Sequence, residues 1–308
     1  MSSLARRLER YREIVPDFES FLEAHREPPP LHLRVNLLKI RTDWVRERLR
    51  AAGVQSVEEP FCPGLLRLDA PEDLAPGATL LHAAGWVYVQ SASSAVAALA
   101  LGPRPGERVL DLCAAPGSKT TLLVQRMEDR GCLVANEPNR RRLKSLVANL
   151  ERFGATSVLV TAYSGQNFPK RVRFHRVLVD VPCSGEGTWR GPEARPRRVR
   201  PDFRAYLERQ QKALLRRAYE VLEPGGELVY STCTYAPEEN EGVVGPFVEE
   251  TGARVLPVPV GIPGEPGLTA WEGRTFPQEL SLARRLYPHR FDSEGFFVVR
   301  LAKPRGDP

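Results

Sequence analysis

Short apolar runs alternate with amphipathic segments along most of the chain after residue 85. The apolar runs are bounded by turn residues, which is typical of buried strands in a parallel sheet. The segments between them have helical spacing, and repeated strand–helix units indicate a doubly wound α/β sheet. The pattern predicts strands at 87–90, 108–112, 132–136, 158–161, 176–181, 227–231 and 295–301, and helices at 91–101, 118–127, 139–153, 203–222 and 237–250.

The first 85 residues follow a different pattern. Residues 3–26 have helical spacing in two pieces around Pro16, and a short apolar run at 31–36 predicts a strand. We expect a helix over 42–52, capped by Thr42 or Asp43, and a turn-rich stretch over 54–84. The sequence therefore predicts a small α+β domain at 1–85 and a second domain at 86–308, in which the Gly/Pro-rich stretch 255–278 has no predictable path.

Composition places the chain among globular proteins. The 308 residues are 42% hydrophobic and 27% charged, which suits one or two domains with a sizeable core. No apolar run approaches the ~20 residues that span a bilayer, and the N-terminus lacks a hydrophobic signal region. We therefore expect a cytoplasmic protein without a membrane partner. The five cysteines form no C-x-x-C pair, which argues against a disulfide framework and a metal site.

The net charge is +6, and arginine supplies nearly all the positive charge. This excess suits a polyanionic partner, although a GC-rich genome explains it equally well. A basic run follows Trp189, whose ring could stack on a base, and its arginines could bind RNA phosphates. The alternative is a solvated loop. The candidate RNA-binding residues are Arg190, Arg195, Arg197, Arg198 and Arg200, with Arg204 just beyond them.

Residues 109–120 combine a strand, a loop of small residues and the start of a helix. Such a loop lets a ligand approach the backbone and the free N–H groups of the helix. It matches neither the G-x-x-x-x-G-K-[ST] nor the G-x-G-x-x-G pattern, so a pyrophosphate is not the expected ligand. Glu137 follows the next strand, where a carboxylate can accept both ribose hydroxyls. Loop and acid together indicate a nucleoside cofactor such as S-adenosylmethionine, against the alternative of a plain strand–helix turn.

Two cysteines follow two predicted strands. Cys183 lies in D-V-P-C-S-G (180–185), and Cys233 lies in S-T-C-T (231–234). Because ligand sites lie at the carboxyl ends of strands in an open α/β sheet, both thiols can reach one crevice. A thiolate is a strong nucleophile, so the pair indicates covalent chemistry with a second thiol in a separate role. The alternative for either one alone is an inert, small hydrophobic residue.

With these segments the chain resembles the Sun/RsmF-type (NSUN-related) RNA cytosine-5 methyltransferases. The matching segments are R-V-N-L-L-K (34–39), D-L-C-A-A-P-G-S-K-T (111–120), D-V-P-C-S-G-E-G (180–187), Y-S-T-C-T-Y-A-P-E-E-N-E (230–241) and P-H-R-F-D-S-E-G-F-F (288–297). The G-E-G and A-P-E-E-N-E segments are most similar to the RsmF branch, which acts on small-subunit ribosomal RNA. For Arg34 and Asn36, both RNA contact and a structural role remain open.

The resemblance implies a seven-stranded, Rossmann-like methyltransferase domain preceded by a small α+β RNA-binding domain. It implies Cys233 as the nucleophile, Cys183 as an aid to product release, and Asp180 between cofactor and target base. The implied cofactor-binding residues are Cys113, Ala114, Ala115, Pro116, Gly117, Ser118, Lys119, Glu137, Arg142 and Asp180. One departure is the segment 161–167, where the family has an acid near the adenine and this chain has none.

The implied reaction is S-adenosylmethionine-dependent methylation of cytosine C5 in RNA, with 16S ribosomal RNA as the expected substrate. A transfer RNA substrate, a DNA cytosine-5 methyltransferase and an RNA-binding ribosome-assembly factor are the alternatives. An intact cysteine pair and cofactor loop favour an enzyme over the last of these, and the T-C cysteine at 233 favours RNA over DNA.

Overall fold

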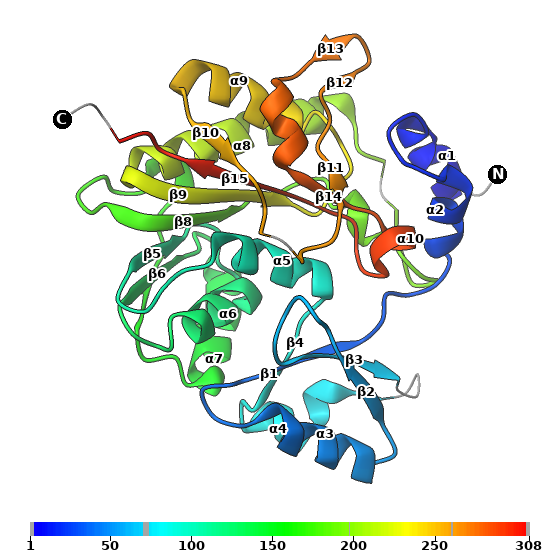
Figure 1. Ribbon diagram of the computed structural model, residues 1–308, viewed down its shortest axis with the longest axis vertical. Helices are drawn as coiled ribbons and strands as arrows, with labels where there is room; N and C mark the ends of the chain where they lie inside the picture. Colours follow the sequence, from blue (N-terminus) through cyan, green and yellow to red (C-terminus); the bar gives the residue numbers. More distant parts are fainter. Residues whose placement is uncertain (1–2, 70–73, 197, 260, 306–308) are drawn as a thin grey trace.

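The structure is a computed structural model that describes residues 3–69, 74–196, 198–259 and 261–305. A small antiparallel sheet with its own helices lies beside a large mixed sheet with helices on both faces (Figure 1). Alternating strands and helices therefore build the larger part, as the sequence pattern predicts.

The small sheet has the strand order β2-β3-β1-β4, and all its pairs are antiparallel. The stretch 54–84, expected to consist of turns, contains two of these strands, and β4 lies just beyond the boundary expected after residue 85. The capping prediction at 42–43 is wrong, because Arg41 precedes the helix without a side-chain cap. The elements are β1 (His32–Val35), α3 (Thr42–Ala51), β2 (Gln55–Glu58), β3 (Leu65–Asp69), α4 (Leu80–Ala83) and β4 (Val87–Val89).

The two N-terminal helices, α1 (Ser3–Leu8) and α2 (Phe18–Ala24), pack against the larger part and not against the small sheet (Figure 1). Tyr11 and Phe21 share a buried cluster with Trp189, Tyr235 and Tyr287, which belong to the larger part. Residues 1–85 therefore contribute to two separate cores.

The large sheet has the order β11-β14-β15-β9-β8-β5-β6-β7, with β10 paired to β15. Strands β7, β6, β5, β8 and β9 are parallel, and β15 joins β9 antiparallel. Seven strands form the main part of this sheet, as the resemblance implies, and the short strands β10 and β11 extend it. The strand expected at 87–90 is not among them, because β4 pairs with β1 in the small sheet, and β14, for which no strand was expected, takes its place. The central strands are β5 (Arg108–Asp111), β6 (Cys132–Asn136), β7 (Val158–Thr161), β8 (Phe174–Asp180), β9 (Leu222–Thr232) and β15 (Phe296–Ala302).

Helices cover both faces of this sheet, each with a separate apolar core. One face carries α5 (Ala92–Leu101), α6 (Ser118–Arg126) and α7 (Arg140–Phe153), and the other carries α8 (Pro201–Glu220) and α9 (Glu241–Thr251). None of the helices in the described ranges is long and apolar enough to cross a membrane.

The stretch 255–278 forms short strands over the edge of the sheet (Figure 1). They are β10 (Arg254–Leu256), β11 (Glu265–Pro266), β12 (Ala270–Trp271) and β13 (Arg274–Thr275), followed by β14 (Arg284–Leu286) and the helix α10 (Pro288–Phe291). Single 3-10 turns lie at Glu9–Tyr11, Pro76–Ala78, Gly165–Asn167, Glu186–Thr188 and Gln278–Leu282.

Arg34 and Asn36 fasten the small sheet to the large part. The buried Arg34 guanidinium donates to Gln90 Oε1 at 2.7 Å, Gln125 Oε1 at 3.0 Å and Thr121 Oγ1 at 2.6 Å. Asn36 is also buried, and its amide donates to the carbonyls of Gly85 and Phe153. Of the two roles left open for Arg34 and Asn36, RNA contact and a structural role, these contacts favour the structural one.

Candidate active site

Three side chains singled out in the sequence, together with Asp111, meet at the carboxyl ends of four neighbouring strands. Asp111 ends β5, Glu137 follows β6, Asp180 ends β8, and Cys233 follows β9. The strands lie side by side in the order β6-β5-β8-β9. This edge of an open parallel sheet is where ligands bind, because the loops there leave a crevice.

The two thiols face each other across this crevice. The Sγ atoms of Cys183 and Cys233 are 3.3 Å apart, and both residues are half-buried. The hydrogen bond to Cys233, together with burial, raises the pKa of Cys183 well above its ordinary value. Cys183 therefore keeps its proton, in hydrogen-bond contact with the sulfur of Cys233.

Lys119 and Asp180 form an ion pair beside the thiols. Lys119 Nζ lies 2.8 Å from Asp180 Oδ2, and Ser231 Oγ donates to Asp180 Oδ1 at 2.7 Å. Burial works to lower the pKa of Lys119, but the charge of Asp180, the hydrogen bond to it and the charge of Cys233 outweigh burial, so the pKa is raised. The ammonium thus supplies a fixed positive charge between the carboxylate and the sulfur.

The loops that carry the two cysteines are joined by short contacts. Ser184 Oγ and Thr234 Oγ1 are 2.7 Å apart, and the backbone N–H of Gly187 donates to the carbonyl of Cys233 at 2.9 Å. A Cβ on Gly187 would lie 2.2 Å from the carbonyl oxygen of Gly295, so only glycine fits there. The G-E-G segment therefore packs closely against the Cys233 loop and holds its backbone in place.

A buried ion network supports both loops from behind. Arg204 donates to Glu186 Oε1 at 2.9 Å and to Glu239 Oε1 at 3.0 Å. Glu239 Oε2 accepts from the backbone N–H of Ser184, and Glu186 Oε2 accepts from Thr234 Oγ1. Both glutamates lie within the motifs that carry the family resemblance but had no expected role, and Arg204 was expected among the RNA-binding arginines. Arg204 is buried, so it positions the cysteine loops instead.

A pocket of about 260 Å³ opens beside the thiols and contains Cys113, Glu137 and Arg142. Glu137 is buried, and its Oε2 lies 3.2 Å from Arg142 Nη1 while its Oε1 accepts from the Asn139 backbone. Arg142 also donates to the carbonyl of Ala115 at 2.6 Å, which ties the acid to the loop of small residues. The arrangement brings together the groups expected to hold a ribose.

The loop of small residues turns sharply from β5 into α6. Gly117 has φ +107°, and a Cβ there would lie 3.1 Å from Leu146 Cδ1, so glycine is required. Burial, with the charges of Asp111, Asp180 and Glu137, raises the pKa of Cys113, which therefore stays a neutral thiol. Of the remaining predicted loop residues, Ala114, Ala115 and Pro116 lie between β5 and α6, and Ser118 is the first residue of α6.

Asp111 is a site residue that the sequence analysis did not single out. It is buried, its Oδ2 accepts from Thr120 Oγ1 at 2.8 Å, and its Oδ1 has no hydrogen-bond partner among the described residues. Burial raises its pKa to about 7. Its position, first in the D-L-C-A-A-P-G segment, was the available signal. An unpartnered buried carboxylate oxygen fits a ligand that brings a positive charge or a donor.

Neutral polar side chains occupy the segment after β7, where the sequence has no acid. Ser164 Oγ donates to Gln166 Oε1 at 2.6 Å, and the Gln166 amide donates to Gln210 Oε1 on α8. Gln166 and Gln210 both line the pocket that contains Glu137. Amide groups can both donate and accept, so they can pair with the edge of a base without a charge.

Two of the expected RNA contacts are corrected by the structure. Arg190 is buried and donates to the carbonyls of Ala24 at 3.1 Å and Ser293 at 2.9 Å, so its guanidinium is already engaged by the protein. Trp189 is also buried, in the cluster with the N-terminal helices, and cannot stack on a base. Because Trp189 and Arg190 pack against α2 and the C-terminal segment, this part of the basic run has a structural role.

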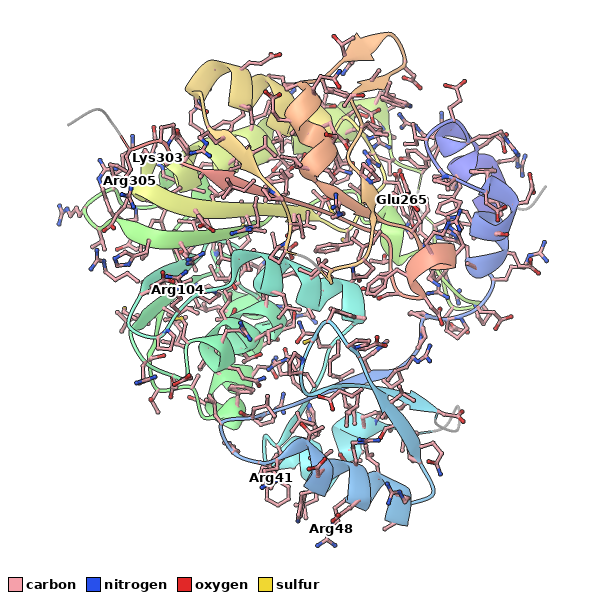
Figure 2. The ribbon with its side chains drawn as sticks, viewed as in Figure 1. Arg41, Arg48, Arg104, Glu265, Lys303 and Arg305 are labelled. Carbon is pink, nitrogen blue, oxygen red and sulfur yellow. The ribbon has the colours of Figure 1, made fainter. Side chains whose placement is uncertain are left out.

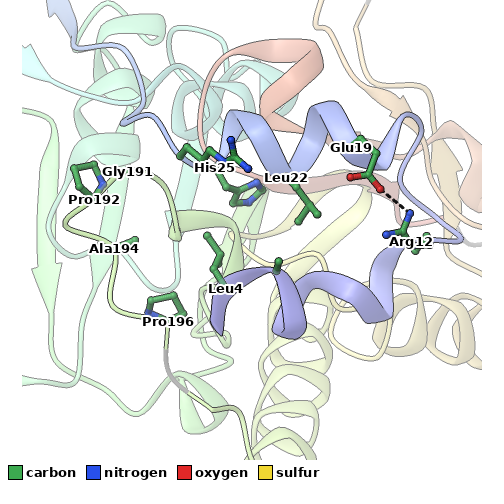
Figure 3. A pocket seen from close by; sticks show the side chains of 11 residues that line it. Leu4, Arg12, Glu19, Leu22, His25, Gly191, Pro192, Ala194 and Pro196 are labelled. Carbon is green, nitrogen blue, oxygen red and sulfur yellow. Dashed lines mark hydrogen bonds and ion pairs between the residues drawn. The ribbon is translucent and has the colours of Figure 1, made fainter. Parts of the chain in front are cut away.

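The rest of the basic run is exposed as expected. Arg195, Arg198 and Arg200 are exposed, and Arg197 lies outside the described residues. The loop at 191–196 borders a hollow of about 780 Å³ whose other wall is formed by the N-terminal helices, with Leu4, Leu22 and the Arg12–Glu19 pair (Figure 3). The loop that carries Arg195 therefore borders a hollow in the surface.

Positive charge is also present far from the thiols. Figure 2 shows Arg41 and Arg48 at the outer end of the N-terminal domain, and Lys303 and Arg305 near the end of the chain. The basic surface thus extends beyond the arginine-rich loop, and charge alone does not locate an RNA path.

Comparison with known proteins agrees with this geometry. Residues 98–302 match the family described as 16S rRNA methyltransferase RsmB/F, and residues 8–75 match the RsmF/B-like ferredoxin-like domain. A crystal structure of a methyltransferase homologue from Pyrococcus horikoshii has a TM-score of 0.86 at 34% identity, covering 98% of this chain and 100% of that one. The expected fold, a Rossmann-like methyltransferase domain after a smaller α+β domain, is confirmed.

Two curated relatives differ in how much of their length this chain spans. It is 36% identical over 305 residues to a mouse 28S rRNA (cytosine-C(5))-methyltransferase, covering 96% of this chain but only 38% of that protein. It is 35% identical over 299 residues to a Pyrococcus abyssi tRNA (cytosine(49)-C(5))-methyltransferase, covering 97% of this chain and 96% of that protein. Because the RsmB/F match extends over more than half of the chain, on the part that holds both cysteines, the chain belongs to the RsmB/F family of methyltransferases.

Proposed function

We propose that this protein methylates cytosine C5 in RNA with S-adenosylmethionine, through a covalent bond between Cys233 and cytosine C6. One observation carries the proposal: two thiols lie 3.3 Å apart at the strand ends, next to the Lys119–Asp180 ion pair. A pair of this kind supplies a nucleophile and a separate proton-transfer group within one crevice.

The residues in the neighbouring pocket fit the proposed cofactor. The buried Glu137 carboxylate suits two ribose hydroxyls, and the buried Asp111 Oδ1 lacks a partner among the described residues. Arg142 holds Glu137 against the loop at Ala115, and Gly117 keeps that loop close to α6. When bound, S-adenosylmethionine supplies an electrophilic methyl group on its sulfonium.

Attack on the ring is the first step of the proposed mechanism. The Cys233 thiolate forms a bond to C6, and the electron pair of the C5–C6 double bond moves into the ring, which becomes nucleophilic at C5. A proton moves to N3 from the Lys119–Asp180 pair, which lies on the same side of the crevice. The cytosine has to leave its stack to reach this position, at a cost of roughly a few kcal/mol.

Release restores both the aromatic ring and the thiol. After C5 gains its methyl group, the C5 proton leaves to a base and the electrons of that C–H bond re-form the C5–C6 double bond. The C6–S bond breaks, Cys233 leaves as a thiolate, and the proton on N3 returns to the Lys119–Asp180 pair. Cys183 touches the sulfur of Cys233 and holds a proton of its own, so it is placed to assist this exchange. The exposed arginines Arg195, Arg198 and Arg200 would contact the RNA backbone beside the crevice.

Small-subunit ribosomal RNA is our first candidate substrate, because the matching family is described as acting on 16S rRNA. Transfer RNA is the second candidate, since the tRNA-modifying relative is matched over nearly the full length of both chains. The test incubates purified protein with each RNA, and with DNA of the same sequence, and maps 5-methylcytosine by bisulfite sequencing. Methylation in RNA alone is expected; methylation of DNA alone, or of nothing, would contradict the proposal.

A further inference from the structure

Two aromatic rings on the first turns of α8 are exposed side by side. Phe203 is 49% exposed and Tyr206 is 48% exposed. Their ring centroids lie 6.3 Å apart, and the ring planes differ by 20°. A spacing of three residues puts both on one face of the helix, while Arg204 and Leu207 between and after them turn into the protein. The result is a pair of half-exposed, nearly parallel aromatic rings at the surface.

The surroundings of this surface connect the two parts of the candidate active site. Tyr206 lines the pocket that contains Glu137, and Pro182, the neighbour of Cys183, lines the same pocket. On the other side, Phe203 directly follows the loop that carries the exposed Arg198 and Arg200. The aromatic pair therefore lies between the crevice with the thiols and the basic loop.

We propose that Phe203 and Tyr206 form a stacking platform for a base of the substrate RNA, next to the target cytosine. This inference rests on the proposed function. Every base has a flat π-face, and stacking on an aromatic side chain contributes roughly 1–3 kcal/mol per base without demanding a sequence. The neighbouring arginines complement the phosphates of such a strand, which favours RNA over an apolar protein segment as the occupant.

The proposed reaction at the thiols explains why a stacking surface is useful at this position. A cytosine that enters the crevice leaves its stack, so the base beside it loses a stacking partner. Phe203 and Tyr206 can replace that partner, because their rings are exposed and already nearly parallel in the structure. Part of the cost of extracting the target base is thereby offset by contacts that form only when it has left the strand.

The test measures binding of a short, fluorescein-labelled single-stranded RNA with one central cytosine. Phe203→Ala and Tyr206→Ala should each weaken binding by about ten-fold, as expected for the loss of one stacking contact. The salt dependence should stay unchanged, since no charge is removed, and Phe203→Tyr and Tyr206→Phe should bind like wild type. Val172→Ala is the control: Val172 is 51% exposed and precedes β8, at the opposite end of the strand from Asp180.

A second arm identifies the contacted nucleotide. RNAs with one abasic nucleotide on either side of the cytosine are bound to wild type and to Tyr206→Ala. At the stacked position the abasic RNA should bind equally weakly to both proteins, because the contact is already missing. Alanine variants that bind all RNAs like wild type would overturn the inference, as would the absence of such coupling at every position.

Calorimetry with S-adenosylmethionine separates the platform from a cofactor cover. Phe203 does not line the pocket that contains Glu137, so Phe203→Ala should bind S-adenosylmethionine as wild type does. Weakened cofactor binding with unchanged RNA binding, in either alanine variant, would assign the rings to the cofactor and overturn the inference. If wild type binds and methylates RNA, and the alanine variants bind RNA as tightly as wild type, the stacking platform is ruled out while the proposed function stands. Wild-type protein that binds no RNA would overturn the proposed function together with the platform.

Discussion

At the scale of single residues, the two thiols differ although their motifs look alike. Cys183 is in hydrogen-bond contact with the sulfur of Cys233, and the pKa of Cys183 is raised by that contact and by burial. Cys233 also interacts with the positive charge of Lys119. The asymmetry agrees with the order of roles expected from the T-C and P-C motifs, and it can be tested directly.

Replacement of each thiol should have opposite effects on covalent trapping. Cys233→Ala should neither methylate RNA nor form an adduct, because attack on C6 is lost. Cys183→Ala should attack and methylate but release slowly, so a protein–RNA complex should accumulate that survives denaturing electrophoresis. The double variant should form none, and Cys132→Ala, on β6, is a matched control. Trapping by Cys233→Ala and not by Cys183→Ala would reverse the roles.

Asp111 should make stability depend on pH. Burial raises its pKa to about 7, so the folded protein keeps a proton that the unfolded chain loses near its ordinary value of 3.8. The unfolded state therefore gains relative stability as the pH rises through this interval, on the order of 4 kcal/mol in total, and the effect levels off above the folded pKa. At a pH low enough to protonate Asp111 in the unfolded chain as well, Asp111 no longer lowers the free energy of unfolding.

Asp111→Asn should remove that dependence while keeping an acceptor for Thr120. Its free energy of unfolding relative to wild type should rise up to pH 7 and then stay constant, as measured by urea unfolding on both sides of pH 7. A difference that does not change with pH would mean that Asp111 titrates at its ordinary value.

At the scale of elements, the arginine-rich loop divides into an exposed and a buried part. Arg195, Arg198 and Arg200 are exposed, whereas Arg190 and Arg204 are held by carbonyls and carboxylates of other elements. A count of charges along the sequence could not separate them, because burial here depends on contacts with α2, the C-terminal segment and two glutamates.

Neutralising the exposed arginines should weaken RNA binding without a loss of stability. Each of Arg195→Gln, Arg198→Gln and Arg200→Gln should reduce the slope of log affinity against log salt by roughly 0.7–0.9 if it removes one phosphate contact. Arg104→Gln is the control, since Arg104 is exposed but precedes β5, away from the thiols (Figure 2). Slopes that remain equal to wild type would favour a solvated loop.

At the scale of the whole molecule, the N-terminal region is joined to the catalytic part at two places. Tyr11 hydrogen-bonds to Glu186, which also binds Arg204 behind the cysteine loops. The Arg34 guanidinium donates hydrogen bonds to Thr121 and Gln125 of α6, the helix that starts at the loop of small residues. The N-terminal region, which is expected to bind RNA, therefore contacts both the elements behind the cysteine loops and the helix that follows the cofactor loop.

Arg34→Lys should destabilise the whole protein, because a lysine cannot supply the three directed donors that Gln90, Gln125 and Thr121 accept. We expect a loss of roughly 2–4 kcal/mol in the free energy of unfolding. Chemical denaturation measures it, with Arg41→Lys as the exposed control. Equal stability of the two variants would contradict a structural role for Arg34.

The sequence by itself determined the alternating strands and helices from residue 91 to residue 250, the loop at 113–119, and the two cysteine motifs. These features are local: apolar periodicity sets the elements, and motif residues follow strand ends directly in the chain. The same patterns failed at 54–84 and 255–278, where short strands depend on partners far away, such as β3 on β1 and β10 on β15.

Only the tertiary structure decided which side chains are available for function. It buried Arg190, Trp189 and Arg34 and left Phe203 and Tyr206 exposed, although all five lie in sequences that look equally able to contact RNA. The physical reason is that burial results from contacts between distant segments, and these contacts set the surroundings of a side chain independently of its neighbours in the chain.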